Sequence, residues 1–223
     1  MGCTESLPVV QAYDVPFELD PVFKPIGRDF GAGPSTTGPT VILVKEKFFS
    51  WSGDDFKIKT FPSREPFGNG LKVKGKVFAI RDQMALVDGD NNLVAVCLRK
   101  FEVIGQTFKI YVPKPVLKDQ QPSKQDYNGK KLYTYAEVRR VPLTMSQEVI
   151  MEGRAAPEFV ITRAGSMWPK QRLIKKKGKP ATLMQGGTWG ERFNSYKITV
   201  NPGIDPCLMI CVAAICDEMD EQN

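Results

Sequence analysis

The sequence predicts a mostly-β domain in which a closed antiparallel barrel surrounds one buried C-terminal helix. From Val41 onward, short stretches of alternating apolar and polar residues are separated by turn-forming residues, which is typical of a β-meander. The chain then reaches a run from Cys207 to Cys216 that is apolar at every position. A long meander usually closes on itself to remove its edges. A helix that is apolar on all sides has to be buried.

The first 40 residues differ in composition from the rest of the chain. They contain six prolines and end in a Gly-Ala-Gly-Pro-Ser-Thr-Thr-Gly run, which favours an extended tail over regular structure. Five acidic and two basic residues give this tail a charge of −3, so the remainder carries +9 within a formal total of +6. We therefore expect a Pro/Gly-rich tail over 1–40 and one domain over 41–223. The aromatic residues Tyr13, Phe17 and Phe23 are expected to pack onto that domain.

The strands of the domain are predicted from period-2 alternation. It is clearest from Leu71 to Ala79, where Lys72, Lys74 and Lys76 alternate with apolar residues or glycine, as in a half-buried strand. Asn-Gly, Asp-Gly and Gly-Gly turns separate the predicted strands from one another. The other predicted strands are Val41–Phe49, Phe56–Lys59, Gln83–Val87, Leu93–Arg99, Phe108–Val112, Leu132–Arg140, Glu158–Arg163, Ala181–Gln185 and Arg192–Val200.

The last predicted element is a helix over about 206–219. Asp205 is a natural N-cap and Pro206 suits the first helical position, while Asp217 and Glu218 follow the apolar run. A bilayer-spanning helix needs about 20 apolar residues, and this run is much shorter. We expect the helix to pass through the barrel and fill it.

The composition argues against most catalytic chemistry. The chain contains no histidine, which excludes Ser-His-Asp and Cys-His catalysis and histidine general bases. Its five cysteines have no C-x-x-C spacing, so neither a zinc site nor a disulfide framework is indicated. No signal peptide is recognised at the N-terminus. We expect a cytoplasmic, non-enzymatic protein without a cofactor or a metal.

Several stretches, in this order, resemble the LURP-one-related family. They are Lys72-Val73-Lys74-Gly75-Lys76-Val77-Phe78, then Arg81-Asp82 and Leu86-Val87-Asp88, and the ending Ile198–Asp205 before an apolar helix closed by Asp217-Glu218. The resemblance runs from about Val41 to Met219, interrupted by a loop from Pro113 to Lys131. The family is similar to the tubby C-terminal domain and the phospholipid scramblases. That similarity implies a closed barrel of about twelve strands around a central helix, no enzymatic activity and a link to membrane lipid.

Two sequence features are candidate membrane contacts. The densest basic cluster is a lipid-binding candidate, because four to eight bases in a short stretch can hold an anionic membrane; the alternative is a solvated hairpin. It consists of Lys170, Arg172, Lys175, Lys176, Lys177 and Lys179. The N-terminal Met1-Gly2-Cys3-Thr4-Glu5-Ser6 matches a myristoylation pattern at Gly2, with Cys3 available for palmitoylation. Two acyl chains anchor a protein stably, whereas one is marginal.

These features together favour a non-enzymatic, membrane-associated module that binds anionic phospholipid of the phosphoinositide type. The sequence pI near 9.0 is compatible with such a partner, and a monomer is expected. Binding to a protein partner or to nucleic acid is one alternative, although no clustered aromatic pattern typical of single-strand binding is present. Scramblase-like lipid transport is the other alternative, and the lack of a spanning segment counts against it.

Overall fold

A computed structural model gives the fold of the chain, and it describes residues 16–45, 56–74, 83–100, 106–163, 171–186 and 195–221. The described elements follow a simple order of many strands and then one long helix. They are η1 (Arg28–Phe30), β1 (Thr40–Lys45), β2 (Phe56–Lys57), β3 (Lys59–Thr60), β4 (Lys72–Lys74), β5 (Gln83–Val87), β6 (Leu93–Lys100), β7 (Thr107–Val112), β8 (Asp126–Tyr127), β9 (Lys130–Lys131), β10 (Tyr133–Arg140), β11 (Gln147–Met151), β12 (Phe159–Arg163), β13 (Gln171–Lys176), β14 (Lys179–Gly186), β15 (Ser195–Val200) and α1 (Pro206–Glu221).

One large antiparallel sheet forms the wall of the molecule. It contains 13 strands in the order β2-β4-β5-β6-β7-β10-β11-β12-β13-β14-β15-β1-β3, while β8 and β9 form a separate two-stranded ribbon. Most neighbours in the sheet are also neighbours in sequence, as expected for a meander. The pair most distant in sequence is β1 with β15, which runs from Thr40 opposite Val200 to Lys45 opposite Ser195. This pairing brings the start of the domain beside its last strand.

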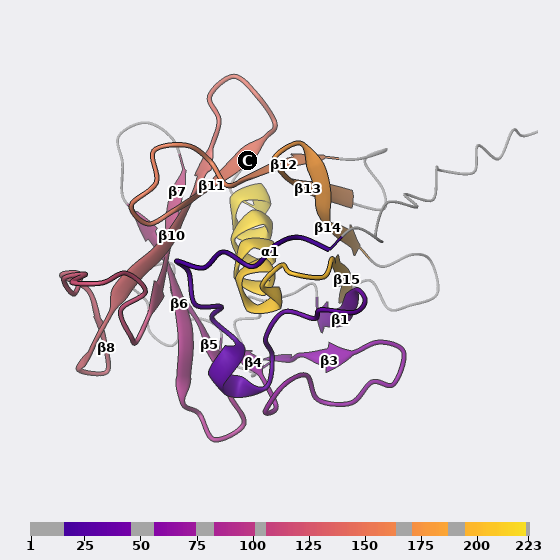
Figure 1. Ribbon diagram of the computed structural model, residues 1–223, viewed down its shortest axis with the longest axis horizontal. Coiled ribbons are helices and arrows are strands. Elements are labelled where there is room, and N and C mark those ends of the chain that lie inside the picture. Colours follow the sequence, from indigo (N-terminus) through magenta and orange to yellow (C-terminus); the bar gives the residue numbers. More distant parts are fainter. Residues whose placement is uncertain are drawn as a thin grey trace, which may run out of the picture.

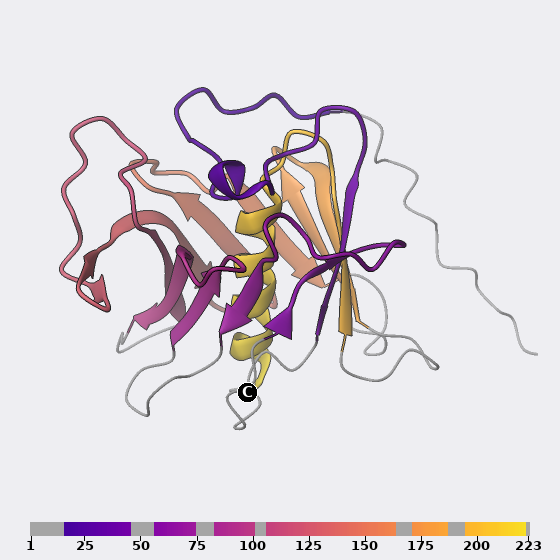
Figure 2. The ribbon, with the colours of Figure 1, turned by 90° about the horizontal axis from the view of Figure 1, so that it is seen from below.

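The sheet curves around α1, which lies at the centre of the molecule (Figures 1 and 2). Every residue of α1 from Cys207 to Met219 is buried, and the apolar ones share one core with wall residues such as Phe108, Ile110 and Ile198. Burying a large aliphatic side chain stabilises a fold by about 1.5–3 kcal/mol, so the helix contributes much of the core. The predicted buried helix is confirmed, and it extends two residues beyond the predicted end. No helix among the described residues is long and apolar enough to span a membrane.

The prediction of a closed barrel is wrong, because the hydrogen-bonded sheet has two ends, β2 and β3. These two-residue strands belong to one chain segment and are separated only by Ile58. β2 pairs with β4 on one side, and β3 pairs with β1 on the other. At Ile58 the N–H donates to the Leu71 carbonyl, and the Ile58 carbonyl accepts from the N–H of Phe67. The strand pairing therefore changes partner at this residue, where β2 and β3 continue as one chain segment.

Residues 16–39, hereafter the strap, cover one end of this sheet. Their composition predicts that they belong to the tail, but Phe23, Ile26 and Ala32 are buried in the main core. The strap lies over the start of α1, and the end of α1 lies at the opposite end of the sheet (Figure 2). We call these the strap end and the helix-exit end. The expected packing of Phe17 and Phe23 onto the domain is confirmed, whereas Tyr13 lies outside the described residues.

Candidate functional site

The predicted basic cluster lies on β13 and on the hairpin that joins β13 to β14. The hairpin turn is Lys177-Gly178, and both residues have positive φ, 49° and 76°. This is the backbone pattern of tight two-residue hairpin turns. Side chains alternate between the two faces of a strand, and Arg172 and Lys176 are both buried. Lys175 is half-buried, and Lys177 and Lys179 are exposed. The five bases of the cluster that the structure describes therefore do not form a single patch.

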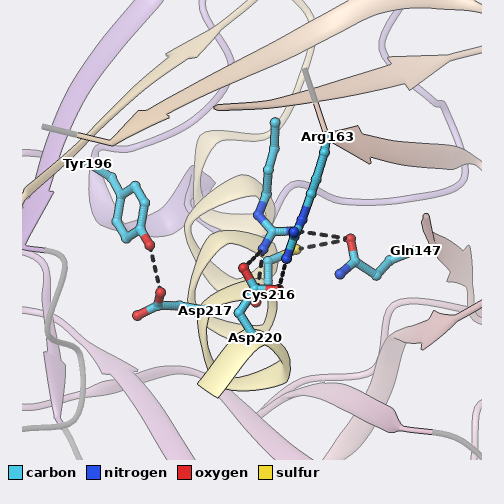
Figure 3. Close-up of polar contacts among 7 residues, drawn as sticks. Gln147, Arg163, Tyr196, Cys216, Asp217 and Asp220 are labelled. Carbon is cyan, nitrogen blue, oxygen red and sulfur yellow. Dashed lines mark hydrogen bonds and ion pairs between the residues drawn. The ribbon is translucent and has the colours of Figure 1, made fainter. Parts of the chain in front are cut away.

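Arg172 is part of a polar network at the helix-exit end (Figure 3). Its guanidinium donates to Gln147 Oε1 at 3.2 Å and to the Cys216 carbonyl oxygen at 3.3 Å, and it forms an ion pair with Asp220. A cation at this position complements the partial negative charge of the last helical carbonyls. Burial is the largest single influence on the pKa of Asp220 and acts to raise it, but the charges and hydrogen bonds of Arg172 and Arg163 together outweigh burial and lower the pKa. Arg172 therefore holds the end of α1 to the wall and is not placed to meet a membrane.

Lys176 is part of a second network, at the strap end. Its Nζ lies 3.0 Å from Glu158 Oε1, with both side chains about nine-tenths buried, and it lies over the ring of Phe17 at 6.0 Å from the centroid. Arg154 joins the same group by pairing with Glu158 and with Asp20 of the strap. The lysine is thus used inside the molecule to hold the strap.

Three bases of the cluster remain on the surface, namely Lys175, Lys177 and Lys179, hereafter the lysine hairpin. Within the described ranges, no ion pair is formed by any of them. Two large apolar side chains of the strap, Leu19 and Val22, are about half exposed at the same end of the sheet. Leu19 lines one cavity together with Lys176, which places the strap beside the hairpin. The fold therefore places these exposed apolar side chains and the lysine hairpin at the same end of the sheet (Figure 2).

Leu19 and Val22 were not predicted as site residues from the sequence. They lie in an acidic, proline-rich stretch, and their exposure depends on how the strap packs.

Three of the predicted residues, Gly2, Cys3 and Lys170, lie outside the described residues. Gln171, the next residue after Lys170, is at the other end of β13 from Lys176. Five strand steps of about 3.4 Å separate these two ends by roughly 17 Å.

Asp205 is a buried acid at the strap end with a strongly raised pKa. Its carboxylate accepts the N–H of Cys207 at 2.9 Å, which caps α1, and the N–H of Ile26 at 2.5 Å, which holds the strap. Burial raises the pKa of Asp205 to about 6, even though these backbone hydrogen bonds act to lower it.

Burial also raises the pKa of the Cys216 thiol, at the other end of α1, to about 11. No group of metal-ligating side chains occurs among the residues that the structure describes.

The raised pKa of Asp205 gives a testable pH dependence. The folded protein binds this proton more tightly than the unfolded chain, whose aspartate has a pKa near 3.8. Stability from this group therefore rises as pH falls through about 6. Between pH 7 and pH 5 we expect a gain of about 1 kcal/mol in the free energy of unfolding, measured by urea titration. Asp205→Asn should abolish this gain, and an identical pH response in that variant would contradict the assignment.

The geometry defines a β-sheet protein folded around a central helix, with structural networks at both ends of that helix. Residues 40–217 match the LURP-one-related family, so the chain belongs to this family, which is tubby-like in fold. The family predicted from the sequence is thereby confirmed. A solved X-ray structure of an Arabidopsis thaliana protein is similar, with a TM-score of 0.53, 16% sequence identity, and coverage of 85% of this chain and 94% of that chain. At this identity the similarity shows the fold alone. No curated protein matches the chain.

Proposed function

We propose that the protein is a non-enzymatic, membrane-associated module that binds anionic phospholipid through the lysine hairpin. The observation that carries this proposal is the placement of Lys175, Lys177 and Lys179 on a tight turn. They form no ion pair within the described residues. Each lysine near an anionic bilayer contributes about 1 kcal/mol of attraction. A rigid turn that presents several ammonium groups suits a headgroup with several phosphates, as in phosphoinositides.

The neighbouring apolar side chains support a lipid surface as the partner. Leu19 and Val22 lie at the strap end with the lysine hairpin. Apolar residues beside basic ones are the combination by which peripheral proteins enter the interfacial region of a bilayer. The strap also connects in sequence to Gly2 and Cys3, the candidate acylation sites. Acyl chains there and the lysine hairpin would act on the same cytoplasmic face of a membrane.

Flotation with vesicles tests this proposal. Unacylated recombinant protein is mixed with neutral phosphatidylcholine vesicles and with vesicles that also contain phosphatidylserine or a phosphoinositide. We expect binding to the anionic vesicles only. Replacing Lys175, Lys177 and Lys179 with glutamine should weaken that binding roughly 100-fold. The matched control replaces Lys57, Lys59 and Lys74 with glutamine, which removes the same charge from strands β2 to β4, away from the hairpin.

Other outcomes would favour the alternatives. Equal weakening in both variants would mean that net charge, and not the hairpin, attracts the vesicles. Salt-sensitive binding to single-stranded DNA without any lipid binding would favour a nucleic-acid partner. Movement of a fluorescent lipid between leaflets on addition of the protein would favour scramblase-like transport.

A further inference from the structure

The hairpin between β10 and β11 presents two apolar side chains to solvent at the helix-exit end. Leu143 has a relative exposure of 108% and Met145 of 64%, the two highest values for large apolar side chains among the described residues. Neither residue contributes to the core. Their position in the turn between two strands makes them the outermost apolar groups of that hairpin.

The conformation of this hairpin tip is held by its own hydrogen bonds. The N–H of Val141 donates to the Ser146 carbonyl at 3.0 Å, and the N–H of Thr144 donates to the Val141 carbonyl at 3.3 Å. The Thr144 hydroxyl also bonds to the Val141 carbonyl and to the Ser146 hydroxyl. Leu143 has a φ of 61°, a left-handed conformation that is unfavourable for leucine. The polar groups of the tip thus bond to one another, while both apolar side chains point away from the protein.

The charges around the tip are arranged with cations outward. Arg139 is 46% exposed and pairs with Glu148, which is 21% exposed; Arg163 is 47% exposed and pairs with Asp220, which is 7% exposed. In each pair the guanidinium faces solvent more than the carboxylate does. The acids Asp217 and Glu218 at the end of α1 are buried. An apolar tip beside exposed guanidinium groups matches the interfacial region of an anionic bilayer.

The tip and the lysine hairpin lie at opposite ends of the molecule. Arg140 and Gln147, which flank the tip, pair with each other in the sheet, and Gln147 is bonded to Arg172 at the end of α1. Lys176, adjacent to the lysine hairpin, lines a cavity with Asp205 and Leu208 at the start of α1. The 16 residues of α1 correspond to a length of about 24 Å. A flat membrane that meets the molecule at one end of α1 therefore does not reach the other end.

We propose that the protein bridges two anionic membrane surfaces, one at the lysine hairpin and the other at the tip formed by Leu143 and Met145. This inference rests on the proposed function, because the first contact is the lipid-binding hairpin. The second contact is independent of that hairpin in sequence and in space. The expected activity is the clustering of vesicles by the monomeric protein.

Vesicle clustering measured by dynamic light scattering tests the inference. The full chain is added to vesicles of phosphatidylcholine and phosphatidylserine, and flotation is measured on the same samples. The wild-type protein should both float with the vesicles and cluster them. Replacing Leu143 and Met145 with serine should leave flotation unchanged and slow clustering by about tenfold or more, given the free energy of transferring two apolar side chains. The control, Val160→Ser, removes an exposed apolar side chain from β12 and should cluster normally.

The two proposals fail in different ways. A wild-type protein that floats without clustering would overturn the bridging inference and leave lipid binding intact. Clustering that persists in the Leu143/Met145 variant would also overturn it, because the second contact would then lie elsewhere. Absence of flotation with every anionic vesicle would remove the proposed function, and the bridging inference with it.

Discussion

Replacing Arg172 with alanine is expected to lower the free energy of unfolding by about 3–5 kcal/mol. The substitution would leave the Asp220 carboxylate, only 7% exposed, with Arg163 as its one remaining partner among the described residues. It would also remove the donor to the Cys216 carbonyl at the end of α1. Urea unfolding followed by circular dichroism measures the effect. Lys175→Ala is the matched control, because this neighbouring side chain points to the other face, and it should change stability by less than about 0.5 kcal/mol.

Acid should reduce the difference between the Arg172→Ala variant and the wild-type protein. The pKa of Asp220 is lowered in the folded state, so the stability from this pair is present above the usual aspartate range and is lost as pH falls through the lowered folded pKa. If Arg172→Ala and Lys175→Ala lowered the stability equally at neutral pH, the polar network in Figure 3 would not stabilise the end of α1.

Replacing Asp205 with alanine is expected to destabilise the protein by about 3 kcal/mol at neutral pH. Loss of an N-cap costs about 1 kcal/mol, and an unpaired buried N–H, here that of Ile26, costs about 1–3 kcal/mol. Asp205→Asn keeps one side-chain oxygen as an acceptor and should lose less. Because the strap is held at this point, trypsin should cleave after Arg28 faster in the alanine variant. Unchanged cleavage alongside lowered stability would mean that Asp205 caps α1 without holding the strap.

The central helix and most strands could be predicted because their local patterns agree with their environment. The run from Cys207 to Cys216 is apolar on every side, and the structure buries it on every side. Strand β13 could not be found in this way. Two of its inward positions hold Arg172 and Lys176, so the stretch has the composition of a solvated loop. Arg172 and Lys176 can occupy inward positions of the strand because each pairs with a carboxylate. These partners, Asp220 and Glu158, are distant in sequence.

The functional surfaces were harder to predict than the fold. The sequence places six bases together, but the alternation of β13 turns two of them inward and leaves the lysine hairpin. Leu19 and Val22 belong to an acidic, proline-rich stretch whose packing is set by Arg154 and Asp205. Leu143 and Met145 lie in a turn, where apolar residues carry no periodic signal. In each case exposure is decided by tertiary contacts that a local pattern does not contain.

The position of α1 in the chain has a consequence for how the protein reaches its native state during translation. Every described strand precedes α1, so synthesis produces the wall before the helix that fills it. Until the helix arrives, inner-face residues such as Phe108, Ile110 and Ile198 have no central partner. Nascent chains with exposed apolar surface are prone to aggregate. A nascent chain on a ribosome that pauses before Pro206 would therefore depend on chaperones. A chain whose α1 has already left the ribosome would not.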